Sequence, residues 1–388
     1  MTIHCWVVSL LVVFLMVLPT PAQNSRKPMT GSAAKGAASA SMQVVPDLDR
    51  RLARFREVRM PFHAERLTTR ERKLLEKLVD ASRYLEEIFW RQSDPEGLTL
   101  YQSLAASKSP KDQKLRRYLR INASRFDLID ENKPLVGTAP MPLGRGFYPQ
   151  GLTRKQIEQY VQDHPEKRAE IYSTTAVVRW HGDQLEGLPY HIAYRSFLEP
   201  AAKDLQEAAD LSDDPGFANF LRLRADALLT DDYFKSDLAW LDLKDPKFDV
   251  IFAPYETYTD GLLGVKASYD AAVLVRNPEE SRKLALFQKY VADLQDALPL
   301  APEDRPSKHG LESPMEVVDA PYRAGDLRHG TRQWPTICRM IPECMSRKAA
   351  RRFFSKTSWT RASTTSFCRW RNGSWHRIRR RWRRPTDI

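Results

Sequence analysis

Apolar residues recur at helical spacing over several long stretches of the chain. The longest predicted helix opens at Thr68, where Glu71 three residues later completes the spacing of a capping box. Leucines and other apolar residues then repeat with a helical period to about residue 90. Thr153 and Gln156 have the same capping spacing and predict a short helix to about residue 164. We expect both helices to pack an apolar face on a core.

Three more helices are predicted in the following part of the chain. Two of them, over residues 199–211 and 216–229, are separated by an Asp-Asp-Pro break. The third begins at Asn277, which is followed by Pro278 and two glutamates, a combination that favours a helix amino terminus. This helix is expected to run to about residue 298, before Pro299.

Strand-like runs are fewer and do not alternate regularly with the helices. The clearest cover residues 172–180 (YSTTAVVRW) and 248–258 (FDVIFAPYETY). Residues 127–150 contain four prolines and predict a long loop. We find no internal repeat. The pattern indicates an α+β fold, mostly helical, rather than a doubly wound parallel sheet.

The amino terminus carries a targeting pattern. Residues 7–18 are apolar except for Ser9, which is too short for a membrane-spanning helix and suits a signal peptide. We predict cleavage after Ala22, so that residues 1–22 are a signal peptide and residues 23–45, rich in Ala, Ser and Gly, are a flexible linker. An uncleaved anchor and a misassigned start codon remain alternatives. The protein is expected to be exported, to the periplasm or outside the cell, with no membrane span left after cleavage.

Charge divides the chain near residue 330. The net charge is +12, but residues 331–388 hold 16 Lys and Arg against two acids, Glu343 and Asp387. The remainder of the chain therefore has a net charge of −2. This near-neutral body argues against a nucleic-acid partner.

Familiar catalytic motifs are missing from the sequence. There is no Gly-x-Ser-x-Gly elbow, phosphate-binding loop or dinucleotide glycine fingerprint. None of the eight histidines is followed by Glu, which excludes a His-Glu-x-x-His zinc helix. His181 and His191 lie ten residues apart in a turn-rich segment and are interpreted as ordinary histidines.

Several segments in order nevertheless resemble a known family. They include GRGFYPQGLTRKQIEQYVQDHPEKRAEIYSTTAVVRW, PYHIAYRSFLEPA and FLRLRADALLTDDYFKSDLAWLDL, and the most specific is PYETYTDGLLGVKA from Pro254 to Ala267. Together they are similar to the dipeptidyl peptidase III family of zinc metallopeptidases, in its exported bacterial form and in the form fused to Nudix domains in plants. The resemblance covers residues 46–330.

The resemblance implies a two-lobed fold with a wide cleft. Residues 46–270 would form a lobe containing a small β-barrel, and residues 271–330 would begin the helical lobe that carries zinc in intact family members. It also implies substrate-binding roles for Asp249, which would hold the amino group of a peptide, and for Glu256 and Tyr258. A solvated acid at Asp249 and structural hydrogen bonds at the other two residues are the alternatives.

The Arg- and Trp-rich tail, residues 331–388, departs from the family. Read one nucleotide earlier, codons for Ser358 to Arg361 can give Met-Asp-Ala, and the whole tail can become a balanced, family-like sequence. We therefore expect a shifted reading frame after Gly330. The chain would be a truncated family member that lacks the zinc motif, binds no cofactor and is catalytically inactive. The alternative is a secreted binding module whose basic tail, with RIRRRWRR at residues 377–384, binds anionic polymers or membrane surfaces.

Overall fold

A computed structural model describes residues 43–55, 62, 64–288, 290–301, 315–329, 352–355, 367–371 and 374–378. The predicted signal peptide and almost all of the predicted linker lie outside the described residues, as does most of the tail after residue 330. In the described part of the chain, no helix is long and apolar enough to cross a membrane.

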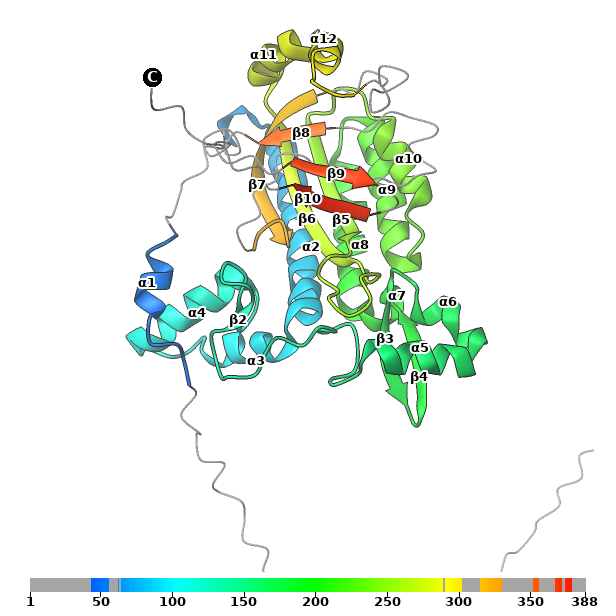
Figure 1. Ribbon diagram of the computed structural model, residues 1–388. Helices are drawn as coiled ribbons and strands as arrows, with labels where there is room; N and C mark the ends of the chain where they lie inside the picture. The colour runs from blue at the N-terminus through cyan, green and yellow to red at the C-terminus, as the bar shows by residue number, and fades with distance from the viewer. Residues whose placement is uncertain are drawn as a thin grey trace, which may run out of the picture. The chain divides into compact units, whose positions relative to one another are not determined.

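Helices and strands are mixed, as the sequence predicts (Figure 1). The helices are α1 Leu48–Leu52, α2 Thr69–Ser93, α3 Pro95–Ser103, α4 Pro110–Asn122, α5 Arg154–Asp163, α6 Arg168–Ile171, α7 Tyr190–Ala193, α8 Arg195–Leu211, α9 Pro215–Thr230, α10 Phe234–Leu241, α11 Pro278–Gln288 and α12 Val291–Asp296. The strands are β1 Phe126–Asp127, β2 Lys133–Pro134, β3 Ala176–His181, β4 Gln184–Pro189, β5 Phe248–Glu256, β6 Ser268–Arg276, β7 Met315–Gly325, β8 Arg352–Ser355, β9 Phe367–Arg371 and β10 Ser374–Ile378.

Side-chain caps determine where the predicted helices begin. At α2, the Thr68 hydroxyl accepts a hydrogen bond from the backbone N–H of Glu71, whose carboxylate accepts one from the N–H of Thr68. Thr153 and Gln156 form the same capping box at α5. These reciprocal bonds satisfy amides that the helix itself leaves unpaired. Both predicted starts are therefore confirmed.

The helix predicted from Asn277 to about residue 298 begins as expected but is not continuous. The Asn277 side chain accepts a hydrogen bond from the N–H of Glu280, and Pro278 is the first residue of α11. The helical stretch is then divided into α11 and α12, with Tyr290 in a turn between them. The start of α11 packs on β7, but the apolar residues Leu286, Tyr290 and Leu294 further along are all more than half exposed.

The largest sheet has the strand order β5-β6-β7-β8. β6 is antiparallel to both β5 and β7, whereas β7 and β8 are parallel. β5 and β8 stand at the two edges, so in the described residues the sheet is open. The small β-barrel that the resemblance implies is therefore not observed, because closure needs the two edge strands to pair with each other. The boundary predicted at residue 270 falls inside β6.

The main core lies between one face of this sheet and the helices α2, α8 and α9, which pack on one another. α2 also contacts β6 and β7. β6 is buried on both faces except at its last residue, which explains why the segment SYDAAVLVR lacks the alternation of a half-buried strand.

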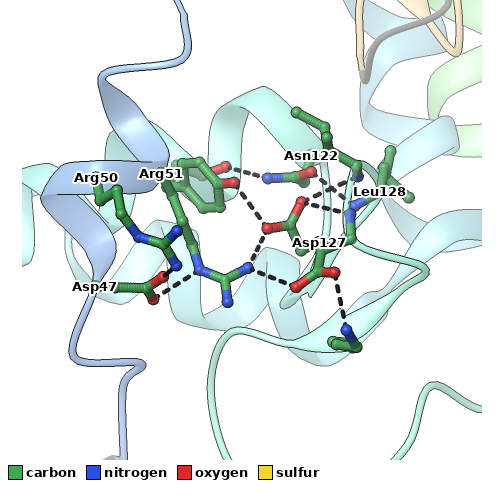
Figure 2. A network of polar contacts seen from close by, with 10 residues as sticks. Asp47, Arg50, Arg51, Asn122, Asp127 and Leu128 are labelled. Carbon is green, nitrogen blue, oxygen red and sulfur yellow. Dashed lines mark hydrogen bonds and ion pairs between the residues drawn. The ribbon is translucent and has the colours of Figure 1, made fainter.

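A second, smaller core joins α1, α3 and α4, and Tyr118 of this core takes part in a polar network (Figure 2). The Arg51 side chain lies between the carboxylates of Asp47 and Asp127. Asp127 is fully buried and also accepts a hydrogen bond from the Tyr118 hydroxyl at 2.9 Å and from the N–H of Ile129 at 3.0 Å. Because its carboxylate has several donors, this buried charge is well compensated.

Candidate functional site

Two of the predicted substrate residues, Glu256 and Tyr258, lie where β5 ends. A bulge between Pro254 and Glu256 shifts the register, so that Glu256 stands opposite Ser268 on β6. Glu256 is exposed, and it is the last residue of β5. Tyr258 therefore lies in the following turn rather than on the strand, with 46% of its surface exposed. Both residues remain accessible to a ligand.

Two further acids lie at this end of the sheet. Asp270, on β6, is buried, and it is paired with Gly325 at the end of β7. Asp326 follows directly and its carboxylate accepts a hydrogen bond from the Tyr258 hydroxyl. The N–H of Leu327 donates to Asp270 at 3.3 Å. The turn after β7 thus brings Asp326 beside the residues that follow β5.

Electrostatics mark these carboxylates as one acidic cluster. Burial raises the pKa of Asp270 well above its usual range, and the nearby charges of Asp326 and Glu256 raise it further. Nearby like charges favour the protonated form of a carboxyl, and a neighbouring positive charge offsets them. We call Glu256, Asp270, Asp326 and Tyr258 the acidic end of the sheet.

A basic residue lies on the same face of the sheet. Arg323 stands opposite Ala272, two positions along β6 from Asp270, and side chains two apart on a strand share a face. Arg323 is half-buried, and burial lowers its pKa. No ion pair involves it among the described residues. This face therefore offers carboxylates and a guanidinium at neighbouring register positions.

The third predicted substrate residue, Asp249, is placed elsewhere. It lies seven residues before Glu256 along β5, a separation of about 20 Å at the rise of an extended strand. Asp249 is buried, and its Oδ1 accepts hydrogen bonds from Trp240 Nε1 at 2.9 Å and from the N–H of Val250 at 2.7 Å. It is therefore not the solvated acid of the alternative interpretation. The structure brings Glu256 and Tyr258 together but keeps Asp249 apart from both.

The histidines considered as metal ligands have separate partners. His181 is exposed and lies 3.4 Å from Glu186 Oε1, whereas the Nδ1 of His191 donates to Asp231 at 2.8 Å. Among the described residues, no group of three His, Cys, Asp or Glu side chains could hold a metal ion.

Comparison with solved structures decides the relationship. Dipeptidyl peptidase III from Caldithrix abyssi superposes with a TM-score of 0.75 and 34% sequence identity, covering 80% of this chain and 59% of that one. The enzyme of the same name from Corallococcus sp. strain EGB gives a TM-score of 0.71 and 30% identity, covering 81% and 59%. The chain is a relative of dipeptidyl peptidase III. The resemblance predicted from the sequence is thereby confirmed.

A plant protein named as a Nudix hydrolase is also similar to this chain, as the resemblance to the Nudix-fused form of the family predicts. Nudix hydrolase 3 from Arabidopsis thaliana is 27% identical over 334 residues, which is 72% of this chain and 43% of that protein. No protein-family model matches the chain. This relative of dipeptidyl peptidase III spans about three fifths of the length of the solved chains and less than half of the length of the plant protein. An activity of those longer proteins is therefore only proposed for it.

Sequence reasoning missed Asp270, Arg323 and Asp326 as members of the site. Asp270 carries a local signal, because it is an acid inside the otherwise apolar run SYDAAVLVR. Arg323 and Asp326 belong to β7 and the turn after it, which no periodicity predicted. Only the pairing of β7 with β6 places Arg323 opposite Ala272 and brings Asp326 beside Tyr258, in the turn after β5.

Proposed function

We propose that this relative of dipeptidyl peptidase III binds peptides through their amino terminus at the acidic end of the sheet, and that the 388 residues alone do not hydrolyse them. The observation that supports the proposal most is the convergence of Tyr258 and Asp326 on a cluster that includes the buried Asp270. Peptidases of the related family act on peptides, which makes a peptide the expected ligand.

An ammonium group suits this cluster for electrostatic reasons. The charges of Asp326 and Glu256 raise the pKa of Asp270, and a positively charged group beside these two carboxylates would offset that repulsion. A peptide amino group carries one positive charge and three N–H donors, so that it can bond to more than one carboxylate at once. We assign Glu256 and Asp326 as the acceptors, with Tyr258 holding the Asp326 carboxylate in place.

Two other side chains receive different roles. Arg323, half-buried on the same face, would donate to a carbonyl or carboxylate oxygen further along the peptide. Asp249 was predicted to hold the amino group, but its hydrogen bond from Trp240 suits a role in fixing α10 against β5. Substitution separates the two assignments: Asp249→Asn should leave peptide affinity unchanged if Glu256 and Asp326 hold the amine.

A binding experiment with a matched variant tests the proposal. Isothermal titration with an unblocked tetrapeptide should show at least tenfold weaker binding for Glu256→Gln. Glu166→Gln removes the same charge from an exposed side chain of the short 3-10 helix Pro165–Lys167 and should bind as the unmodified chain does. Equal affinity of all three proteins would refute the assigned site.

The proposed absence of hydrolysis rests on the sequence, in which no His-Glu pair occurs. Purified protein supplied with zinc should release no dipeptide from an unblocked tetrapeptide and should retain no stoichiometric zinc after gel filtration. Dipeptide-releasing activity that elutes together with the protein in gel filtration would contradict this part of the proposal, but not the proposed peptide-binding site.

The reading-frame change after Gly330 and export of the protein are also proposed. The nucleotide sequence of codons 325–335, extended downstream in all frames, should reveal a His-Glu zinc motif in a shifted frame. Amino-terminal sequencing of protein recovered outside the cytoplasm should give a sequence that begins after Ala22.

The alternative function, a basic tail that binds anionic polymers, gains no support from the relatives.

A further inference from the structure

A cavity of about 310 Å³ lies between α3 and α4. We propose that it binds a phosphate-bearing small anion. Its lining combines an apolar wall with a strongly basic one, formed by Tyr101, Leu104, Ala105, Ser107, Gln113, Arg116, Arg117 and Arg120. No lining residue belongs to β5, β6 or β7, so the inference is independent of peptide binding.

Three arginines of α4 form the basic wall, and no carboxylate is found among the described residues that line the cavity. Arg117 and Arg120 are exposed, and neither forms an ion pair with any residue that the structure describes. The nearest acid in the sequence, Asp112, instead accepts a hydrogen bond from Ser107 at 2.7 Å. Like charges three or four residues apart destabilise a helix, and a bound anion would turn this repulsion into attraction.

The third arginine is held in place before any ligand arrives. The Arg116 guanidinium lies 4.3 Å from the centre of the Tyr101 ring, and its Nε donates to the Tyr101 carbonyl at 3.3 Å. Tyr101 is itself stacked on Trp90, with ring centres 5.1 Å apart. Because Arg116 is fixed between these contacts, less conformational entropy is lost when an anion binds.

The composition of the lining indicates the ligand class. Guanidinium groups form paired hydrogen bonds with phosphate oxygens, and three of them match a doubly charged phosphate better than a single carboxylate. Leu104 and Ala105 can cover the uncharged body of a phosphate monoester. The volume is at the small end for a ligand pocket, which favours a compact molecule.

Calorimetric titration of the full chain at constant ionic strength tests the site, with inorganic phosphate, phenyl phosphate and benzoate as probes. The double variant Arg117→Gln/Arg120→Gln should raise the Kd for phosphate at least tenfold. A control double variant, Lys108→Gln/Lys111→Gln, removes the same charge from exposed side chains that do not line the cavity and should leave the Kd within twofold.

The probes separate the two sources of the phosphate group. Tighter binding of phenyl phosphate than of inorganic phosphate assigns a phosphate ester, whereas equal binding assigns free phosphate; both support the site. Binding of benzoate as tight as that of phosphate would overturn the phosphate assignment. The absence of saturable binding, or equal losses in the two double variants, would overturn the site itself. Circular dichroism spectra of both double variants should match that of the original chain, which excludes a folding defect as the cause of weaker binding.

Discussion

The buried ring of His329 bonds to Glu86 and thereby connects the turn after β7 to helix α2. Its Nε2 lies 2.6 Å from Glu86 Oε1, and its Nδ1 lies 2.7 Å from the carbonyl oxygen of Arg120. Both neighbours are hydrogen-bond acceptors, so His329 donates to both of them only when each ring nitrogen carries a proton. The other oxygen of Glu86 accepts from the N–H of Gly325 at 2.9 Å. Since Asp326 follows Gly325, this pair positions an acid of the proposed peptide site.

Removing the charge of Glu86 should destabilise the fold. Glu86→Gln leaves the imidazolium of His329 buried without its counter-charge, and breaking such a pair costs about 3 kcal/mol. Glu87→Gln, which changes the neighbouring half-exposed glutamate, should cost less than about 1 kcal/mol. Urea denaturation at pH 5.5 measures both. Equal stability of the two variants would show that the buried pair contributes nothing.

The same pair predicts how stability depends on pH. Burial opposes ionisation of Glu86, but the charge and hydrogen bond of His329, with Arg328 and the Gly325 N–H, lower the pKa of Glu86 below its ordinary value of 4.5. The unfolded chain therefore takes up this proton at higher pH than the folded protein does. The stabilisation is present above about pH 4.5 and is lost as the pH falls further. Accordingly, the difference between the original chain and Glu86→Gln should shrink between pH 5.5 and pH 3.5.

Lys266 should make the stability of the folded protein depend on pH in the alkaline range, because burial disfavours its charged form. Its side chain is fully buried, with Nζ donating to the carbonyl oxygens of Ile171 at 2.6 Å and Ser173 at 2.8 Å. Burial lowers the pKa of Lys266 from 10.5 to about 8. Between these values the unfolded chain binds more protons, so the stability of the folded state rises with pH.

The measurement compares the chain with Lys266→Met at pH 7.5 and pH 9.5. The stability of the original chain relative to the variant should rise by about 2 kcal/mol over this interval. Ionisation of other groups contributes to both proteins and cancels in the comparison. A difference that stays constant would show that the ammonium is not perturbed by burial.

Arg224 should be one of the most sensitive positions in the core. Its fully buried guanidinium donates to Asp237 Oδ1 at 2.7 Å and to the carbonyl of Phe252 at 3.2 Å, so that it connects α9 to α10 and β5. Arg224→Leu should lower the unfolding free energy by about 4 kcal/mol, because Asp237 is left buried. Arg222→Leu removes an exposed arginine from the same helix and should cost under about 1 kcal/mol in thermal or urea denaturation. A small loss in both variants would contradict the account.

The pKa of Asp270 should respond to its acidic neighbours. Asp326→Asn removes a charge that raises this pKa, so the carbon-13 titration of Asp270 should move to lower pH. Asp293→Asn, in the exposed part of α12, serves as the control and should leave it unchanged. An unaltered titration in Asp326→Asn would mean that the two carboxylates do not interact.

Local signals in the sequence predicted much of the helical structure. Thr68 and Thr153 mark helix starts that depend only on residues three positions away, and their caps are confirmed. The segment 248–258 predicted β5 because its residues suit a strand. Such features depend on neighbours in the sequence, and the order of residues therefore determines them directly.

Long-range pairing could not be predicted in this way. β7 lies about 40 residues after β6, and its register with β6 places Arg323 opposite Ala272 and brings Asp326 close to Asp270. The expected barrel came from the resemblance and not from strand patterns. The substrate role expected for Asp249 also came from the resemblance, and the structure adds that seven residues of extended strand separate it from Glu256.

The most direct test of peptide binding at the acidic end of the sheet compares two ligands that differ only at the amino terminus. Calorimetric titration with a tetrapeptide and with its amino-acetylated form removes the ammonium group and leaves the remaining contacts intact. The account predicts at least tenfold tighter binding of the unblocked peptide, and loss of this preference in Glu256→Gln. Equal affinity for the two peptides would contradict it.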